Sequence, residues 1–96
     1  RWLLPDLGVP EQARDQHAGR YVAELLVGAD SDAAGRAWHA VAGDDSGDVE
    51  LLEVLRDGAA VPTPRGTEFA AGDRLLVRGA WSDIEAFRRR RGLDWD

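Results

Sequence analysis

The acidic segment DDSGD, Asp44–Asp48, is the densest group of potential metal ligands in the chain. Asp44, Ser46 and Asp48 occupy alternate positions, which is the spacing of the oxygen ligands that open an EF-hand calcium loop. Such a loop then requires glycine at its sixth position and a bidentate glutamate at its twelfth, and this chain has hydrophobic side chains at both. The sequence therefore favours a solvated acidic loop. Weak divalent-cation binding by Asp44, Asp45 and Asp48 is the alternative.

Groups that could carry out catalysis are few. His17 and His39 are the only histidines, and neither has a second metal ligand at a fixed spacing. The chain has no cysteine, no serine in a nucleophile-elbow pattern and no G-x-G-x-x-G dinucleotide-binding motif. No set of acid, base and nucleophile is visible, so we predict that the chain is not an enzyme.

Net charge is −6 over 96 residues and is unevenly distributed. Residues 21–57 carry nine acidic side chains against two arginines, a net charge of −7, whereas residues 58–96 carry seven arginines against six acidic side chains. Phosphate binding needs a continuous basic face, so the acidic middle of the chain disfavours nucleic acid as a general partner, and we predict none. The length allows one small domain. No apolar run approaches the roughly 20 residues that a membrane helix needs.

The pattern of apolar residues predicts a short series of elements after a lead-in at residues 1–20 with at most one weak turn of helix. We expect strands at 21–27, 48–55, 59–61 and 74–79, and helices that begin at Ser31 or Asp32 and at Trp81. Asp57-Gly58 indicates a tight hairpin turn, and Pro62 and Pro64 end the strand that follows it. The order is strand, helix, strand, strand, strand, helix.

Local signals define the ends of the two helices. Ser82 and Glu85 have the spacing of a capping box at the start of the last helix. Ile84 and Phe87 are expected to face the core, and Gly92 is expected to end this helix. Gly43 is expected to end the first helix. We further expect Trp38 and Trp81 to pack in the domain, and Trp2 and Trp95 to contact another subunit.

One stretch, Thr67–Gly79, contains a Gly-Asp turn that leads into a buried strand. Gly72 would supply backbone freedom, and Asp73 would bond the amides of the turn, so we interpret both as structural residues. In order along the chain, this stretch completes a longer pattern: Glu24, Ser31, Gly35, Arg36, Arg56, Gly58, Pro64, Thr67, Phe69, Gly72, Asp73, Leu75–Val77 and Gly79.

In that ordered set the chain resembles the RCK C-terminal family, also called TrkA-C, found in regulators of potassium transport and in other membrane transporters. It departs from the family at Trp38, where an aliphatic side chain is usual. The resemblance implies a small α+β domain at residues 21–91, with a mixed or antiparallel sheet, helices packed on it and a C-terminal tail at 92–96. It also implies regulation and assembly rather than catalysis, with pairing into a homodimer.

The resemblance further implies a regulatory ligand, a cyclic dinucleotide such as cyclic di-adenosine monophosphate or a divalent cation, at the dimer interface. Arg36 and Arg56 are the candidates for its phosphates, since arginine suits bidentate phosphate contacts. A purely structural dimerisation module with no ligand is the competing interpretation.

The flanks RWLLPD and RRRRGLDWD are similar to the segments that border such domains in sodium-coupled divalent-anion symporters. The sequence thus predicts a cytosolic domain at the cytoplasmic face of a membrane transporter, next to its transmembrane part. Arg88–Arg91 could contact anionic lipid or simply complement the helix dipole. The alternative parent is a potassium uptake or efflux system.

Overall fold

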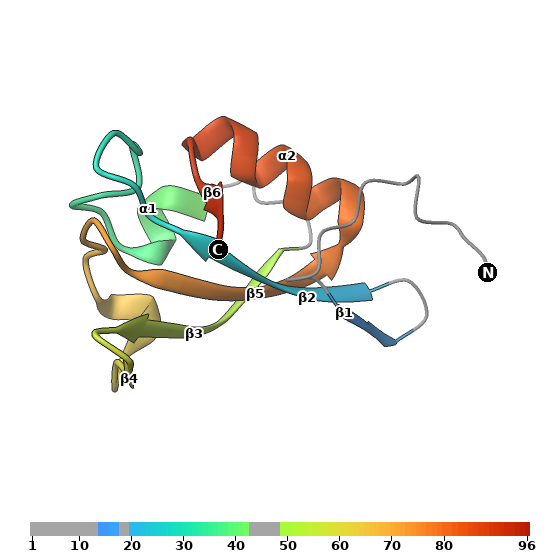
Figure 1. Ribbon diagram of the computed structural model, residues 1–96, viewed down its shortest axis with the longest axis horizontal. Coiled ribbons are helices and arrows are strands. Elements are labelled where there is room, and N and C mark those ends of the chain that lie inside the picture. Colours follow the sequence, from blue (N-terminus) through green and yellow to red (C-terminus); the bar gives the residue numbers. More distant parts are fainter. Residues whose placement is uncertain (1–13, 18–19, 43–48) are drawn as a thin grey trace.

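The computed structural model describes residues 14–17, 20–42 and 49–96, and its centre is an antiparallel sheet (Figure 1). The strands run in the spatial order β1-β2-β5-β3-β4, and β6 adds to β2. Their bounds are Arg14–His17 (β1), Arg20–Leu26 (β2), Glu50–Arg56 (β3), Ala59–Ala60 (β4), Arg74–Ala80 (β5) and Asp94–Trp95 (β6). The helices are α1 (Trp38–Ala42), the 3-10 helix η2 (Pro64–Gly66) and α2 (Trp81–Arg91). The predicted α+β fold is confirmed.

Alternation along the strands separates a buried face of the sheet from an open one. Ala23 on β2 lies opposite Val77 on β5, which lies opposite Leu51 on β3, and all three are at most 2% exposed. Helices α1 and α2 cover this face, where the predicted core positions Ile84 and Phe87 are buried (Figure 1). Side chains one position along point to the opposite face and are half-buried.

The central strand pair depends on β5, which lies between β2 and β3. Its pairing with β3 shifts by one residue between Leu51 and Glu53, so Leu52 is the extra residue of a bulge. The bulge explains why the apolar pattern of this segment alternates only partly. The hairpin from β3 to β4 turns at Asp57 and Gly58, whose φ angles of 54° and 82° match the tight turn predicted there.

The first predicted helix is mostly wrong. Only Trp38–Ala42 is helical, and the segment before it forms successive turns. Gly35 has a φ of +85°, and its N–H donates to the Phe69 carbonyl at 2.7 Å, while the Phe69 N–H donates to the Arg36 carbonyl at 2.8 Å. These long-range bonds hold the backbone out of a helix. Gly43, the predicted end of this helix, lies outside the described residues.

Helix α2 begins at Trp81 and ends before Gly92, as predicted, but its start is not capped in the way that the sequence suggested. Gly92 adopts the left-handed conformation at φ 64°, and its N–H donates to the carbonyls of Arg88 and Arg89. The predicted capping box is wrong: Ala80 occupies the N-cap position, and no side chain caps the helix there. Glu85 instead accepts hydrogen bonds from the two arginines that follow it.

Both flanks of the predicted domain contribute strands. β1, in the segment expected to hold at most a turn of helix, pairs with β2, and β6 pairs with β2 further along. Trp95 stacks on Trp81 with ring centroids 5.0 Å apart, and the Arg88 guanidinium lies 5.0 Å from the Trp95 ring. Trp38 packs against Phe87 inside the domain, as predicted. Trp95 therefore has its aromatic partner inside the domain, whereas Trp2 lies outside the described residues.

Candidate functional site

The Gly-Asp turn before β5 is the most tightly connected polar feature among the described residues. Asp73 is 1% exposed, and its carboxylate accepts hydrogen bonds from Arg56 Nε at 2.9 Å and Arg56 Nη2 at 2.7 Å. The Ala70 N–H donates to the same carboxylate at 2.9 Å, which closes the turn. Gly72 has a φ of +96°, a conformation that glycine adopts without steric cost.

The electrostatics of this pair follow from the geometry. The Arg56 guanidinium, and to a smaller extent the Ala70 N–H, lower the pKa of Asp73 although burial opposes the shift. Arg56 also donates to the Glu68 carbonyl at 3.0 Å. The guanidinium that was predicted to bind a ligand phosphate thus already has a bidentate carboxylate partner, and the pair joins the end of β3 to the turn before β5.

Arg36, the second predicted phosphate ligand, has an exposed side chain in the turn before α1. Both arginines contact the backbone of Glu68 and Phe69, but through different groups. The backbone carbonyl of Arg36 accepts a hydrogen bond from the Phe69 N–H, and the guanidinium of Arg56 donates one to the Glu68 carbonyl. Their proposed role in ligand binding stays a prediction.

The predicted metal ligands Asp44, Asp45 and Asp48 lie outside the described residues. Within the part of the chain that the structure describes, no group of three or more His, Asp or Glu side chains is arranged to hold a metal ion. His39 is exposed on α1.

The basic run at the end of α2 is engaged within the domain. Arg88 and Arg89 each form an ion pair with Glu85 at 3.0 Å, and Arg91 lies 3.8 Å from Asp32. These contacts favour a role of the run within the domain over the alternative that it contacts lipid.

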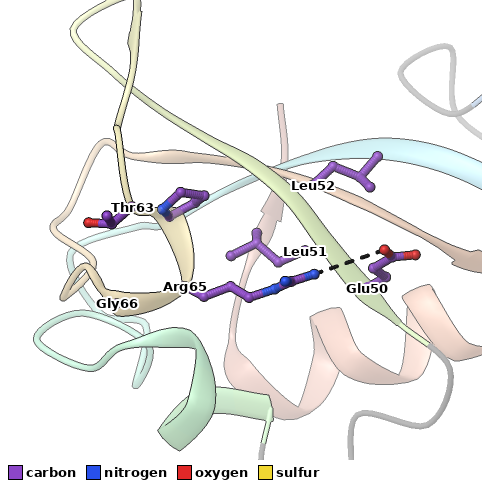
Figure 2. A pocket seen from close by; sticks show the side chains of 7 residues that line it. Glu50, Leu51, Leu52, Thr63, Arg65 and Gly66 are labelled. Carbon is purple, nitrogen blue, oxygen red and sulfur yellow. Dashed lines mark ion pairs between the residues drawn. The ribbon is translucent and has the colours of Figure 1, made fainter.

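A second polar region surrounds an open pocket of about 430 Å³ between β3 and η2 (Figure 2). Leu51, Leu52 and Pro64 provide its apolar lining, with Glu50 and Arg65 beside them. Figure 2 shows the Arg65 side chain extending toward Glu50 across Leu51. A pocket of this size and lining is typical of a small-ligand site.

The charged groups at this pocket are centred on Glu50. Its Oε1 accepts a hydrogen bond from Arg78 at 2.7 Å, and its Oε2 lies 3.9 Å from the Arg65 guanidinium. The Arg78 hydrogen bond and charge, with smaller contributions from Arg65 and Arg20, lower the pKa of Glu50. The carboxylate is therefore ionised at neutral pH.

Sequence reasoning missed all four of these charged residues. Glu50 and Arg78 become neighbours only through the pairing of β3 with β5, so their spacing in the sequence does not indicate that they lie together. The one available signal is Arg65 itself, an arginine directly after the prolines that end a strand.

The chain matches the TrkA-C domain family over residues 22–92. It therefore belongs to this family, whose members are regulatory rather than catalytic domains of ion transport systems, and the resemblance seen in the sequence is confirmed. No curated protein and no solved structure matches the chain at a significant level. In the described residues no helix is long and apolar enough to cross a membrane.

Proposed function

We propose that this TrkA-C domain is a ligand-sensing, non-catalytic regulatory module at the cytoplasmic face of a membrane ion transporter. The observation that carries the proposal is the pocket between β3 and η2, which combines apolar walls with the charged side chains of Arg65 and Glu50 in a family of regulatory domains. A regulatory ligand needs such a site, because it must bind one state of the domain better than another.

Thermal unfolding of the domain with a panel of nucleotides and ions tests ligand sensing. A ligand that binds only the folded state raises the melting temperature with its concentration. We expect at least one anionic compound, with cyclic di-adenosine monophosphate among those tested, to do so, and we expect Arg65→Ala to reduce the shift. A melting temperature that no compound changes would favour the purely structural dimerisation module.

We also propose that the domain forms a homodimer. The open face of the sheet supports this, because Val22, Leu26 and Leu76 are half-buried on the face of β2 and β5 that no described helix covers. A second copy would remove these side chains from water. Light scattering at micromolar concentration should give twice the mass of one chain; a mass of 10.5 kDa would contradict the dimer.

For the parent protein we propose a sodium-coupled divalent-anion symporter type of transporter, because the flanks RWLLPD and RRRRGLDWD are similar to segments in such proteins. The complete chain tests this. Apolar stretches of about 20 residues on both sides of the domain would support it. A G-x-G-x-x-G half-domain directly before residue 1, without a membrane span, would contradict it and favour a potassium transport system.

A further inference from the structure

The pocket between β3 and η2 carries one charge of each sign among the described residues that line it. Arg65 provides the positive charge and Glu50 the negative one, and the other lining residues are apolar or uncharged. Figure 2 shows the Arg65 guanidinium beside the Glu50 carboxylate, with Thr63 and Gly66 further away. The lining is therefore neutral as a whole, and its two opposite charges lie together.

Both charged groups have hydrogen-bonding capacity left over. The distance of 3.9 Å from Arg65 Nη2 to Glu50 Oε2 is too long for a hydrogen bond, and the Arg65 guanidinium has no further ion pair or hydrogen bond within the described parts of the chain. Glu50 uses its other oxygen, Oε1, to accept a hydrogen bond from Arg78 at 2.7 Å. At the pocket, Arg65 thus offers donors and Glu50 Oε2 offers an acceptor.

The neighbouring sheet adds no excess of either charge. Residues that lie opposite one another or two positions apart share a face of a sheet. By this register, the open face of β2, β5 and β3 holds three arginines and three glutamates, namely Arg20, Arg74, Arg78, Glu24, Glu50 and Glu53. The electrostatic character of the site is therefore set by the two charges that line the pocket.

This pair of charges discriminates among ligand classes. An anion without a positive group would bind Arg65 but bring its charge next to Glu50, and a cation alone would meet the guanidinium in the same way. An uncharged ligand would displace water from both groups without replacing its hydrogen bonds, which costs free energy. A ligand that carries a carboxylate and an ammonium group close together avoids all three costs.

We infer that the pocket between β3 and η2 takes a free α-amino acid with an apolar side chain. Its carboxylate accepts hydrogen bonds from Arg65, its ammonium group donates to Glu50 Oε2, and its side chain lies against Leu51, Leu52 and Pro64. Both charged groups are attached to one carbon atom, so they can bridge the two side chains, whereas either end of a peptide carries only one of them. The inference rests on the proposed ligand-sensing function, and it adds an ammonium group to the anionic group expected at Arg65.

Titration calorimetry on the whole 96-residue chain at neutral pH tests the inference. Leucine and phenylalanine represent the ligand class. Isocaproate and phenylpropionate are the same compounds without the amino group, isoamylamine and phenethylamine lack the carboxylate, and glycine lacks the apolar side chain. We expect one or both amino acids to bind, and the analogues and glycine to bind at least about tenfold more weakly, because each has lost a charge-assisted hydrogen bond or the apolar contact.

Three variants test the roles of the residues. Glu50→Gln should weaken amino acid binding and abolish the preference over the analogue without the amino group. Arg65→Gln should weaken it and abolish the preference over the analogue without the carboxylate. These ratios report on recognition of each group, which a general loss of the pocket would not change selectively. Glu53→Gln is the matched control, because Glu53 lies on the same strand without lining the pocket, and it should leave affinity unchanged.

The outcomes separate this inference from the proposed function. Equal binding of an amino acid and its analogue without the amino group by the wild type would overturn the role of Glu50 and the ligand class. Absence of amino acid binding at about 10 mM, above the usual range of Michaelis constants, would do the same. In both cases a nucleotide or ion that raises the melting temperature would leave ligand sensing in place, whereas the absence of any ligand would remove both proposals.

Discussion

The domain contains two arginine–carboxylate regions built from the same chemical groups and differing in burial. At the turn before β5, Asp73 is almost fully buried and takes both a bidentate arginine and a backbone N–H. At the pocket, Glu50 has a side chain that is 40% exposed, is shared between arginines and has one contact of 3.9 Å. A saturated pair with a buried carboxylate holds backbone segments together, whereas an exposed and unsaturated carboxylate can exchange partners.

From this contrast we expect the first region to stabilise the fold and the second to respond to a ligand. Arg56 joins β3 to the turn before β5, so its loss should be felt in unfolding. Arg65 touches only one carboxylate among the described ion pairs, so its loss should be felt in binding. Arg56, which the sequence suggested as a ligand contact, belongs to the first region, because its guanidinium is bonded to Asp73.

The largest effect is expected for Asp73→Leu, which removes the shared acceptor and leaves the Arg56 guanidinium and the Ala70 N–H without it. We expect a loss of about 1–3 kcal/mol in the free energy of unfolding, measured by urea denaturation. Glu50→Leu in the same assay should change the unfolding midpoint much less. If Asp73→Leu kept full stability and lost ligand binding instead, the turn would be the site and the contrast would be reversed.

Gly72→Ala should have the next largest effect. The Cβ of alanine meets no atom within 4 Å there, so the cost comes only from the φ of +96°, at about 1–2 kcal/mol. Gly66→Ala is the matched control, because Gly66 also has open space but lacks a positive φ. Equal unfolding midpoints for the two variants would show that the turn carries no conformational strain when substituted.

Acid should weaken the buried pair in a defined direction. Because the folded state lowers the pKa of Asp73 below its ordinary value of 3.8, its contribution to stability is complete above pH 3.8 and is lost as the pH falls through the folded-state value. The stability gap between wild type and Asp73→Asn should therefore narrow as the pH falls below about 4. Comparing these two proteins cancels other groups, including Glu24, whose pKa is raised by burial and by a hydrogen bond with Asp96. A gap that stays constant down to pH 2 would contradict this role of Asp73.

The smallest effect is expected for Arg65→Ala. Its side chain is 66% exposed, and surface ion pairs contribute little, so the melting temperature should change by no more than about 2 °C. Arg56→Ala should lower it clearly more in the same calorimetric scan. Similar losses in the two variants would mean that the pocket arginine also supports the fold.

Much of the fold could be predicted because local chemistry agrees with the tertiary structure. The β-rich runs at β2, β3 and β5 alternate or are apolar throughout, and Gly92 ends α2 by the conformation that glycine favours. The predictions failed where a distant segment decided the backbone. Gly35 and Arg36 bond to Phe69, more than 30 positions away, and so the start of the expected first helix became a series of turns.

The candidate site was largely beyond prediction for a related reason. The pocket forms because η2 folds back against β3, and Glu50 beside it meets Arg78 because β3 pairs with β5. Both are contacts between segments far apart in the sequence. The Asp73 turn was identified from its Gly-Asp sequence, but its partner Arg56, 17 positions earlier, was interpreted as a ligand contact. The sequence around an arginine at the end of a strand does not indicate whether its guanidinium binds a ligand or a carboxylate of the same chain.

The positions of β1 and β6 on a single strand have a consequence for protein engineering. β1 begins at Arg14 opposite Val22, and the N–H of Asp96, just after β6, donates to the carbonyl of Glu24. Val22 and Glu24 are two positions apart, or about 7 Å along an extended strand. A host protein could therefore receive residues 14–96 as an insertion within a single surface loop, with its own two cut ends kept almost as close as before. Such a fusion would hold a regulatory domain and its host by two short tethers instead of one.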